Sequence, residues 1–421
     1  MSVFERHTLD NGLRVLTADM PSVQSVTCMI MLAAGSRYET PDTNGIAHFA
    51  EHMFFKGTER RPTAREIGME VDGLGGEFNA FTSKEYTGYY VKCAAEHGPV
   101  ALDVLVDMLR HSKFDSEEID REKGVIVEEM NMYYDTPRDF IGGVYDQLLY
   151  GDQPLGWDVI GRKETIRAAT HETFVDYVNR WYKPERMVVG IGGRLGGDEL
   201  ELVDRLLGDV EPADTGAPDA VVANGNGSRV RIHHKDSDQA HLILGVRSYP
   251  IVHPDRWALQ LLSTVLGTGM SSRLFSEVRE RRGLAYYVYA HNQSYTDAGS
   301  LFSQAGVDIN RSEEAVETIV REFRKIAEEP VPAEELEKAR ALAKGRFVLR
   351  LENPQGMIVF GLGREVLNDP VLEPDEVIGG LDAVTAEDIQ RVAHDVIASN
   401  GLNLALIGPF EDEAPFQALL S

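Results

Sequence analysis

The chain has 421 residues, more than one hydrophobic core usually organises, so two domains are the first expectation. Its 43% hydrophobic and 26% charged residues are ordinary for a globular protein and exclude disordered and fibrous architectures. The net charge of −26 argues against binding to a nucleic-acid backbone. Such an acidic surface either keeps the protein soluble or lines a cavity that attracts basic peptides.

The N-terminal sequence gives no sign of export or membrane insertion. Residues 1–15 lack the basic start and the apolar run of a signal peptide, and no apolar stretch reaches membrane-spanning length. Cys28 and Cys93 are the only cysteines, and each lies in a strand-like apolar run, which favours buried thiols over a disulfide. We therefore expect a cytoplasmic protein that has no membrane partner.

The predicted elements follow the same order in the two halves of the chain. In the first half, strands are expected at 13–20, 24–34, 77–82, 87–95 and 186–193, with a helix around 45–54, another at 63–74, and long helical stretches over 98–181. In the second half, strands are expected at 229–234, 240–249, 284–292, 300–308 and 402–410, with helices at 255–267, 271–281 and onward to about 398.

A segment rich in Pro, Gly, Ala, Asp and Asn, residues 211–228, separates the halves and is typical of a linker. The repeated order predicts two homologous α+β domains, each an antiparallel sheet packed against helices. Their expected bounds are 1–210 and 229–421.

The sequence GIAHFAEHMFFKGT, residues 45–58, contains two histidines four residues apart. Helical spacing puts His48, Glu51 and His52 on one face, so two imidazoles and a carboxylate converge. They form a metal site, or the histidines simply pack or face solvent. The corresponding helix of the second half, RWALQLLSTVLG, is plain amphipathic core, so any metal chemistry is confined to the first half.

A catalytic zinc takes three protein ligands, so a third must come from elsewhere in the chain. In the pattern of residues 120–137, which is helical until Pro137, Val125 and Ile126 form the expected apolar stripe. Glu122 and Glu129 fall on that core-facing side, seven residues apart, whereas Glu128 points toward solvent. Burying carboxylates is unfavourable unless they are paired, so these two either serve a metal or form ordinary salt bridges.

The segments HFAEH, FNAFTSKEYTGYY, REKGVIVEEM and RLFSEVRERRGLAYYVY resemble the inverted-motif zinc peptidases over essentially the whole chain. This is the family of pitrilysin, insulin-degrading enzyme and mitochondrial processing peptidase. The length is similar to that of short bacterial members that resemble the processing peptidase β subunit. The resemblance implies one zinc per chain on His48, His52 and Glu129, with Glu51 as catalytic base. Glu122 matches a recurrent family glutamate and is expected to orient a ligand.

The resemblance also assigns a role to Arg279 and Tyr286 in the second half. They match a family arginine–tyrosine pair that holds the substrate backbone and polarises the scissile carbonyl. Without the family match, Tyr286 is one of 15 tyrosines and lies in a strand, where aromatic residues are common.

The predicted strand at 77–82 has the features of a sheet edge. Gly75 and Gly76 interrupt its alternation, as happens where another backbone comes close. A substrate peptide could add to Asn79, Ala80 and Phe81 as an extra strand, with main-chain hydrogen bonds giving affinity and little sequence preference. The alternative is an ordinary hairpin edge.

Together these features predict a zinc metalloendopeptidase that hydrolyses unfolded or short peptides in an enclosed chamber. Two rivals are a non-catalytic assembly or processing-complex subunit of the same fold, and a zinc hydrolase of another substrate. The long family members join two such domain pairs into a clamshell, and their arginine–tyrosine pair comes from the half without the active zinc site. This chain supplies half of a clamshell, so we expect it to dimerise with itself or with a related chain.

Overall fold

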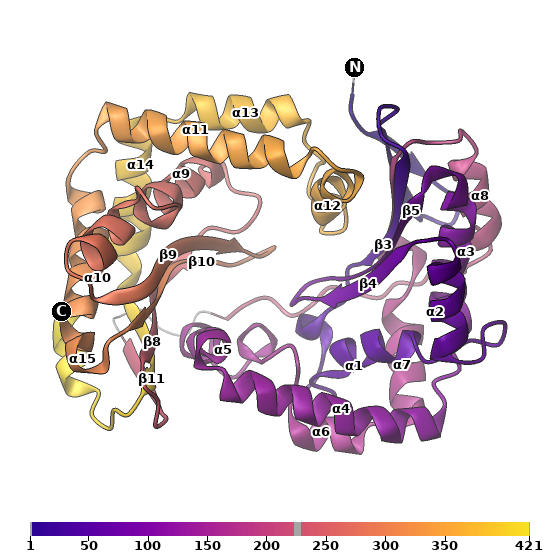
Figure 1. Ribbon diagram of the computed structural model, residues 1–421, viewed down its shortest axis with the longest axis horizontal. Helices are drawn as coiled ribbons and strands as arrows, with labels where there is room; N and C mark the ends of the chain where they lie inside the picture. Colours follow the sequence, from indigo (N-terminus) through magenta and orange to yellow (C-terminus); the bar gives the residue numbers. More distant parts are fainter. Residues whose placement is uncertain (1, 223–228, 421) are drawn as a thin grey trace. The chain divides into compact units, whose positions relative to one another are not determined.

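A computed structural model describes residues 2–222 and 229–420 of the chain and shows two compact α+β units. The first unit contains Met1–Asn131, Trp157–Asp219 and Val348–Pro374, and the second contains Met132–Gly156, Ala220–Phe347 and Asp375–Ser421. Each unit has one β-sheet with helices packed on it (Figure 1). The predicted fold class is therefore confirmed.

The sheet of the first unit has the strand order β1-β2-β6-β3-β5-β4. Its strands are β1 (Glu5–Thr8), β2 (Arg14–Asp19), β3 (Ser25–Leu32), β4 (Glu77–Thr82), β5 (Thr87–Ala94) and β6 (Met187–Gly193). Neighbouring strands pair antiparallel except β2 and β6, which are parallel. β4 pairs with β5 on one side only, so it is an edge of the sheet, as its sequence predicted.

The sheet of the second unit has the order β7-β11-β8-β10-β9. Its strands are β7 (Arg229–His234), β8 (Ala240–Ser248), β9 (Ala285–Ser294), β10 (Gly299–Val307) and β11 (Asn403–Gly408). All pairs are antiparallel except β7 with β11. Both sheets are thus mixed rather than purely antiparallel, because in each the last strand returns to lie parallel to an early strand.

The helices of the two halves follow a similar order along the chain. The first half contains α1 (Ile46–Phe54), α2 (Ala64–Gly73), α3 (Gly98–His111), α4 (Ser116–Asp135), α5 (Pro137–Tyr150), α6 (Lys163–Ala168), α7 (His171–Trp181) and α8 (Glu199–Leu207). The second half contains α9 (Arg256–Gly267), the π-helix η5 (Phe275–Glu280), α10 (Ser312–Glu328), α11 (Ala333–Arg350), α12 (Pro354–Glu365), α13 (Pro374–Ala383), α14 (Ala386–Ala393), the π-helix η7 (His394–Ala398) and α15 (Ala414–Leu419).

Local sequence explains where several helices begin. Thr63 and Glu66 form a capping box at the start of α2, in which each side chain accepts a hydrogen bond from the other residue's backbone N–H. Thr385 and Asp388 do the same at the start of α14. α1 begins instead after Gly45, which has a φ of 97° and no side chain to act as a cap.

The two halves exchange one helix with each other. α12, from the second half, packs on β6 of the first sheet, where a Cβ at Gly190 would lie only 2.5 Å from Leu362. α5, from the first half, packs on β8 and β11 of the second sheet, where a Cβ at Gly245 would lie 2.5 Å from the Tyr145 hydroxyl. Glycine is required at both strand positions because a helix side chain occupies the space of the missing Cβ.

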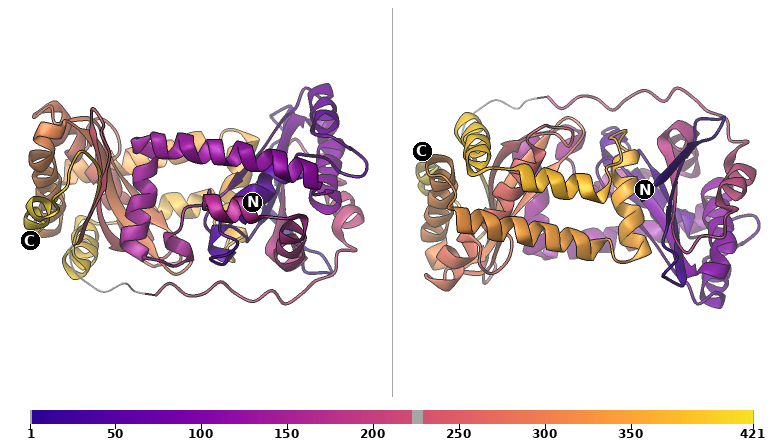
Figure 2. Two further views of the ribbon diagram at one scale, coloured as in Figure 1. Left: turned by 90° about the horizontal axis from the view of Figure 1, so that it is seen from below. Right: turned by 90° about the horizontal axis from the view of Figure 1, so that it is seen from above.

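This exchange changes the expected domain bounds. The predicted division into 1–210 and 229–421 assigns every residue by its place in the sequence, whereas the compact units take 132–156 and 348–374 from the opposite halves. Residues 211–222 of the predicted linker form neither helix nor strand (Figure 2), and residues 223–228 lie outside the described part of the chain.

The structure can be compared with further details of the sequence analysis. β1, at the N-terminus, was not predicted, and Gly75 and Gly76 lie in the turn before β4 rather than inside it. Cys28 and Cys93 are buried free thiols, as predicted. Across the described residues, we find no helix with both the length and the apolar character needed to cross a membrane.

Candidate metal centre

The helix α1 presents its two faces to different surroundings. Its apolar side chains are buried, among them Phe49 and Met53, and the helix packs against α7 and β4. His48, Glu51 and His52 lie on the remaining face and are only partly covered. The i, i+3, i+4 spacing therefore puts all three on one side of the helix, as expected from the sequence.

The helix α4 lies opposite and carries the acidic residues of the site. Its buried stripe contains Ile119, Glu122, Ile126 and Met130. The prediction that Val125 belongs to this stripe is wrong: its exposed fraction is 44%, because the helix is rotated so that Ile126 alone of the pair faces the core. The Glu122 side chain is buried, and the Glu129 side chain is 39% exposed at the edge of the stripe.

Glu128, by contrast, is exposed on another side of α4, as predicted from its face of the helix. The two adjacent glutamates, 128 and 129, therefore have different environments, and only the second of them turns toward α1.

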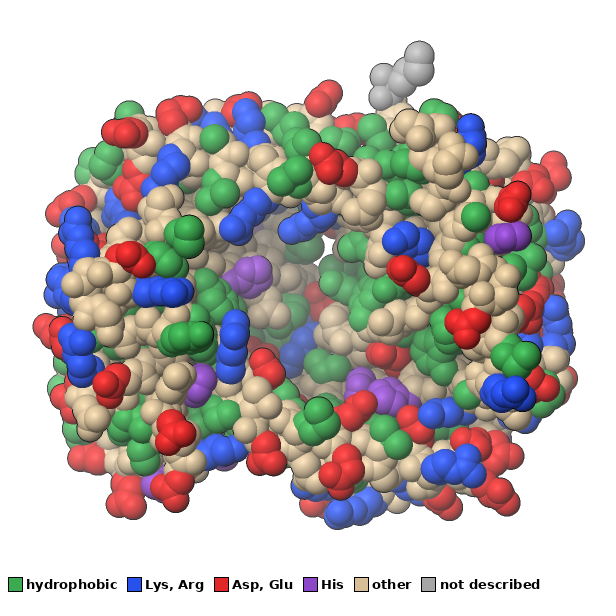
Figure 3. Space-filling model, viewed as in Figure 1, with side chains coloured by type: hydrophobic (Ala, Val, Ile, Leu, Met, Phe, Trp, Pro, Cys, Tyr) green, Lys and Arg blue, Asp and Glu red, His purple; other side chains and the backbone are tan. Residues whose placement is uncertain are grey.

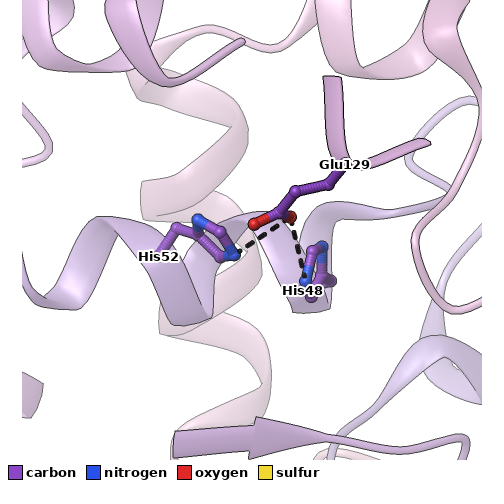
Figure 4. Close-up of side chains that lie close together, drawn as sticks. All are labelled: His48, His52 and Glu129. Carbon is purple, nitrogen blue, oxygen red and sulfur yellow. Dashed lines mark ion pairs between the residues drawn. The ribbon is translucent and has the colours of Figure 1, made fainter. Parts of the chain in front are cut away.

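Three side chains from these two helices converge on one point (Figure 4). Glu129 Oε2 lies 3.8 Å from His48 Nε2 and 3.5 Å from His52 Nε2. One ligand atom from each residue lies within 4.8 Å of the other two. Among the described residues, these three form the cluster of histidine and acidic side chains that could hold a metal ion. The separations are long for hydrogen bonds.

These separations fit a bound zinc ion. Ligand atoms placed tetrahedrally at about 2.0–2.1 Å from zinc lie ~3.4 Å from one another. The two separations of Glu129 Oε2 from the histidine nitrogens, 3.8 and 3.5 Å, are close to this value, and all three ligand atoms lie within 4.8 Å of one another. Two imidazoles and one carboxylate are also the donor types of catalytic zinc sites.

The two histidines have opposite electrostatic surroundings. Burial, helped by the neighbouring His52, lowers the pKa of His48 to about 4, so this imidazole is neutral near pH 7 and can bind a metal without losing a proton. Burial also opposes charge on His52, but the hydrogen bond with Glu122 and the nearby Glu129 outweigh it and raise the pKa of His52.

Glu122 orients one of these rings. Its Oε1 lies 2.9 Å from His52 Nδ1, and this leaves His52 Nε2 to face Glu129. The arrangement is the carboxylate–histidine pair typical of metal sites. Lys56 Nζ lies 2.5 Å from the other oxygen of Glu122, and both contacts hold the pKa of Glu122 below its usual value despite burial.

Lys56 and Thr82 were missed in the sequence. Lys56 lies in the turn after α1 ends at Phe54, so the helical spacing of the histidines does not extend to it. Thr82 ends β4, and its hydroxyl donates a hydrogen bond of 2.5 Å to Glu51 Oε2. Burial raises the pKa of Glu51, and the Thr82 hydrogen bond opposes that rise. No helical pattern signals Thr82, because the contact joins two separate elements.

The three predicted edge residues lie on β4, beside α1. Asn79 is exposed, and its own Oδ1 accepts a hydrogen bond of 2.8 Å from the N–H of Ala80. That N–H is therefore satisfied by a side chain. The ring of Phe81 instead covers Gly88 on β5, where a Cβ would approach the ring to 2.4 Å.

Arg279 and Tyr286 belong to the second compact unit, whereas the metal-ligand group belongs to the first. Arg279 is an exposed residue of the π-helix η5, and its guanidinium lies 4.9 Å from the centre of the Phe275 ring. Tyr286, near the start of the edge strand β9, is 75% exposed. Both side chains are thus accessible for contacts with other molecules.

Comparisons with known proteins identify the family. The family model described as Insulinase (Peptidase family M16) matches residues 14–161, and the one described as Peptidase M16 inactive domain matches residues 168–342. An uncharacterized zinc protease of Bacillus subtilis is 37% identical over 97% of this chain and 98% of its own length. The chain belongs to peptidase family M16, so the resemblance found in the sequence is confirmed.

Further relatives agree. An uncharacterized zinc protease of Streptomyces coelicolor is 35% identical over 97% of this chain and 90% of its own. Among solved structures, a protease from Helicobacter pylori matches with a TM-score of 0.91 at 24% identity, covering 97% of this chain and all (100%) of the other. A Pseudomonas fluorescens structure described as a peptidase M16 inactive domain matches with a TM-score of 0.89 at 19% identity, covering 97% and 98%. These two structures support the fold.

Proposed function

We propose that the protein is a zinc metalloendopeptidase, with one zinc per chain held by His48, His52 and Glu129 and with Glu51 as general base. The observation that carries the proposal is the convergence of the three ligand atoms, with Glu129 Oε2 at 3.8 and 3.5 Å from the two histidine nitrogens and all three atoms within 4.8 Å of one another. Glu51 lies on the same face of α1. Family membership and the zinc protease names of the relatives support it.

The chain's own residues account for the proton transfers. A zinc ion bound here would supply a Lewis acid and lower the pKa of water to about 7. Glu51 precedes His52 directly, so it can take a proton from the attacking water and deliver it to the leaving amine. Its burial raises its pKa toward the working pH, which suits a base that must also release the proton. Thr82 holds the carboxylate in place.

The substrate is held as an added strand on β4. The N–H of Ala80 donates to the side chain of Asn79, and a peptide carbonyl could replace that side chain as acceptor. Phe81 packs on Gly88 and supports the strand from the other side. Main-chain recognition of this kind suits unfolded or short peptides in an enclosed chamber, because it needs an extended backbone and little particular sequence.

Arg279 and Tyr286 would complete the site by binding the substrate backbone and polarising the scissile carbonyl. Their accessibility, and the place of Arg279 in a π-helix, favour a functional role, since π-helical turns are frequent at functional sites. By analogy with the long family members, they would act on the zinc site of a partner chain in a dimer.

Subunit mixing tests that arrangement. Glu51→Gln and Tyr286→Phe variants, each inactive alone, are combined under conditions that exchange subunits, after the oligomeric state is measured. In a mixed homodimer acting in trans, the Tyr286→Phe protomer keeps its zinc and base and receives an intact tyrosine from its partner, so activity returns. No recovery from an exchanging homodimer would show that the pair acts within one chain.

The metal assignment has its own test. Glu129→Gln should lose most of its zinc, measured by metal analysis after dialysis, because it removes a ligand. Glu128→Gln is the matched control, since this neighbouring glutamate is exposed and turned away. Zinc lost from the Glu128 variant and retained by the Glu129 variant would contradict the ligand set.

The main alternative is a non-catalytic assembly or processing-complex subunit. The complete set of ligand and base residues favours the enzyme, because a subunit that had lost catalysis would not need them. A digest of a peptide library by zinc-loaded protein separates the two: cleavage abolished by Glu51→Gln supports the peptidase, and an uncut library supports the subunit.

A further inference from the structure

The two histidines of the candidate metal centre are held in different ways. The His52 ring is fixed by its hydrogen bond with Glu122. The Nδ1 atom of His48 is buried and has no hydrogen-bond partner among the described residues. The direction of the His48 ring toward Glu129 therefore depends on packing and on the backbone of the first turn of α1, where His48 is the third residue.

The beginning of α1 cannot be capped in the usual way. Helices normally begin with Ser, Thr, Asp or Asn, whose side chain accepts a backbone N–H of the first turn. Here the position is Gly45, with a φ of 97°, and a Cβ would lie 2.8 Å from Gly161 Cα and 2.9 Å from the Ile160 carbonyl. The close approach of residues 160–161 excludes a side chain, so the cap must come from elsewhere.

Glu39 supplies that cap from outside the helix. Its Oε1 accepts a hydrogen bond of 2.8 Å from the N–H of Ala47, and its Oε2 accepts bonds from the N–H of Gly45 at 2.8 Å and from Asn44 Nδ2 at 2.9 Å. The residue is 5% exposed. A carboxylate at this end of a helix also interacts favourably with the helix dipole.

Keeping an acidic residue here is unfavourable in itself. Burial raises the pKa of Glu39, and the three N–H donors and the nearby Lys84 oppose that rise because they stabilise the charged form. These interactions compensate the desolvation of the carboxylate. The three N–H donors all lie within the four residues that precede His48.

We propose that Glu39 is a positioning residue of the metal centre, which fixes the first turn of α1 so that His48 faces Glu129. It does for His48, through the backbone, what Glu122 does for His52 through a side chain. The inference rests on the proposed metal site. Without Glu39, the first turn would loosen, His48 Nε2 would no longer be held 3.8 Å from Glu129 Oε2, and zinc would bind more weakly.

The test measures zinc affinity by competition with a chromophoric chelator. Glu39→Gln replaces one acceptor oxygen with an amide that donates, so zinc affinity should fall about 10–100-fold. The visible spectrum of the cobalt-substituted protein should change as well, since it reports ligand geometry. The kcat for peptides should fall with little change in KM.

Glu365→Gln is the matched control. Glu365 is another buried glutamate of the first unit, paired with Arg6 and Arg14. This variant should lower the thermal stability of the protein and leave zinc affinity and the cobalt spectrum unchanged. If Glu39→Gln behaves like the control, Glu39 is only structural and the proposal is overturned.

A measurement on the unmodified protein covers the case in which Glu39→Gln does not fold. Coupling between two sites is reciprocal, so if Glu39 helps zinc bind, zinc must tighten the Glu39 contacts. Amide hydrogen exchange at Gly45 and Ala47 should then slow when zinc is added. Unchanged exchange would overturn the proposal. A protein that binds zinc but cuts no peptide would refute the proposed function and leave this test intact, and one that binds no zinc would refute both.

Discussion

The helices α1 and α9 occupy the same place in the two repeats, yet only α1 carries histidine or carboxylate side chains. α1 buries one face and leaves His48, Glu51 and His52 toward α4. α9 is buried almost all round from Ala258 to Gly267, and it lies so close to β9 that a Cβ at Gly267 would overlap the Ala290 backbone. A duplicated fold thus keeps one helix for chemistry and the other for packing.

The largest expected effect follows from changing the base on α1. Glu51→Gln should reduce kcat about 10²–10⁴-fold, the usual contribution of a positioned general base, because the amide cannot accept the proton. Zinc content should stay unchanged, since Glu51 is not among the three converging ligands. Full activity in this variant would remove the catalytic distinction between the two helices.

The packing helix should respond in the opposite way. Leu262→Ala in α9 removes a fully buried side chain, so the free energy of unfolding should fall by about 2–5 kcal/mol, measured by denaturant titration. Zinc affinity should not change, because α9 carries no residue of the metal-ligand group. Zinc lost from the still-folded variant would show that the packing repeat supports the metal directly.

A smaller effect is expected at Glu122, the hydrogen-bond partner of the His52 ring. Glu122→Gln should weaken zinc binding about 10–100-fold, because the ring loses its charged partner. The exposed Glu128→Gln on the same helix serves as control and should bind zinc normally. Equal affinities in both variants would mean that the ring of His52 is held by packing alone.

The sequence revealed those parts of the site that depend on helical spacing. His48, Glu51 and His52 share one turn of α1, and Glu129 follows from the face of α4. Val125 was misplaced because an adjacent apolar pair does not say which of its members faces the core. The contact of Thr82 with Glu51 joins two separate elements, and Glu39 reaches the start of α1 from a preceding loop that has no regular period, so helical spacing predicts neither contact.

The same limit applies to the fold. Strand and helix order could be predicted, because it follows from local periodicity. The exchange of α5 and α12 could not, since both helices are amphipathic and nothing in their own sequences tells which sheet they cover. The signal lies instead in the strands, at Gly190 and Gly245, whose missing side chains make room for a helix.

That exchange has a consequence for how such a chain folds and how it arose. α5 and α12 are counterparts, so each repeat delivers the same helix to the other's sheet and neither completes its own core. The sheet of the first repeat is covered by residues 354–365, which lie more than 160 positions after its last strand. Its folding therefore depends on contacts between residues far apart in the chain. A single repeat of this architecture would need this helix from a second copy to cover its sheet, and the two repeats within one chain supply it to each other.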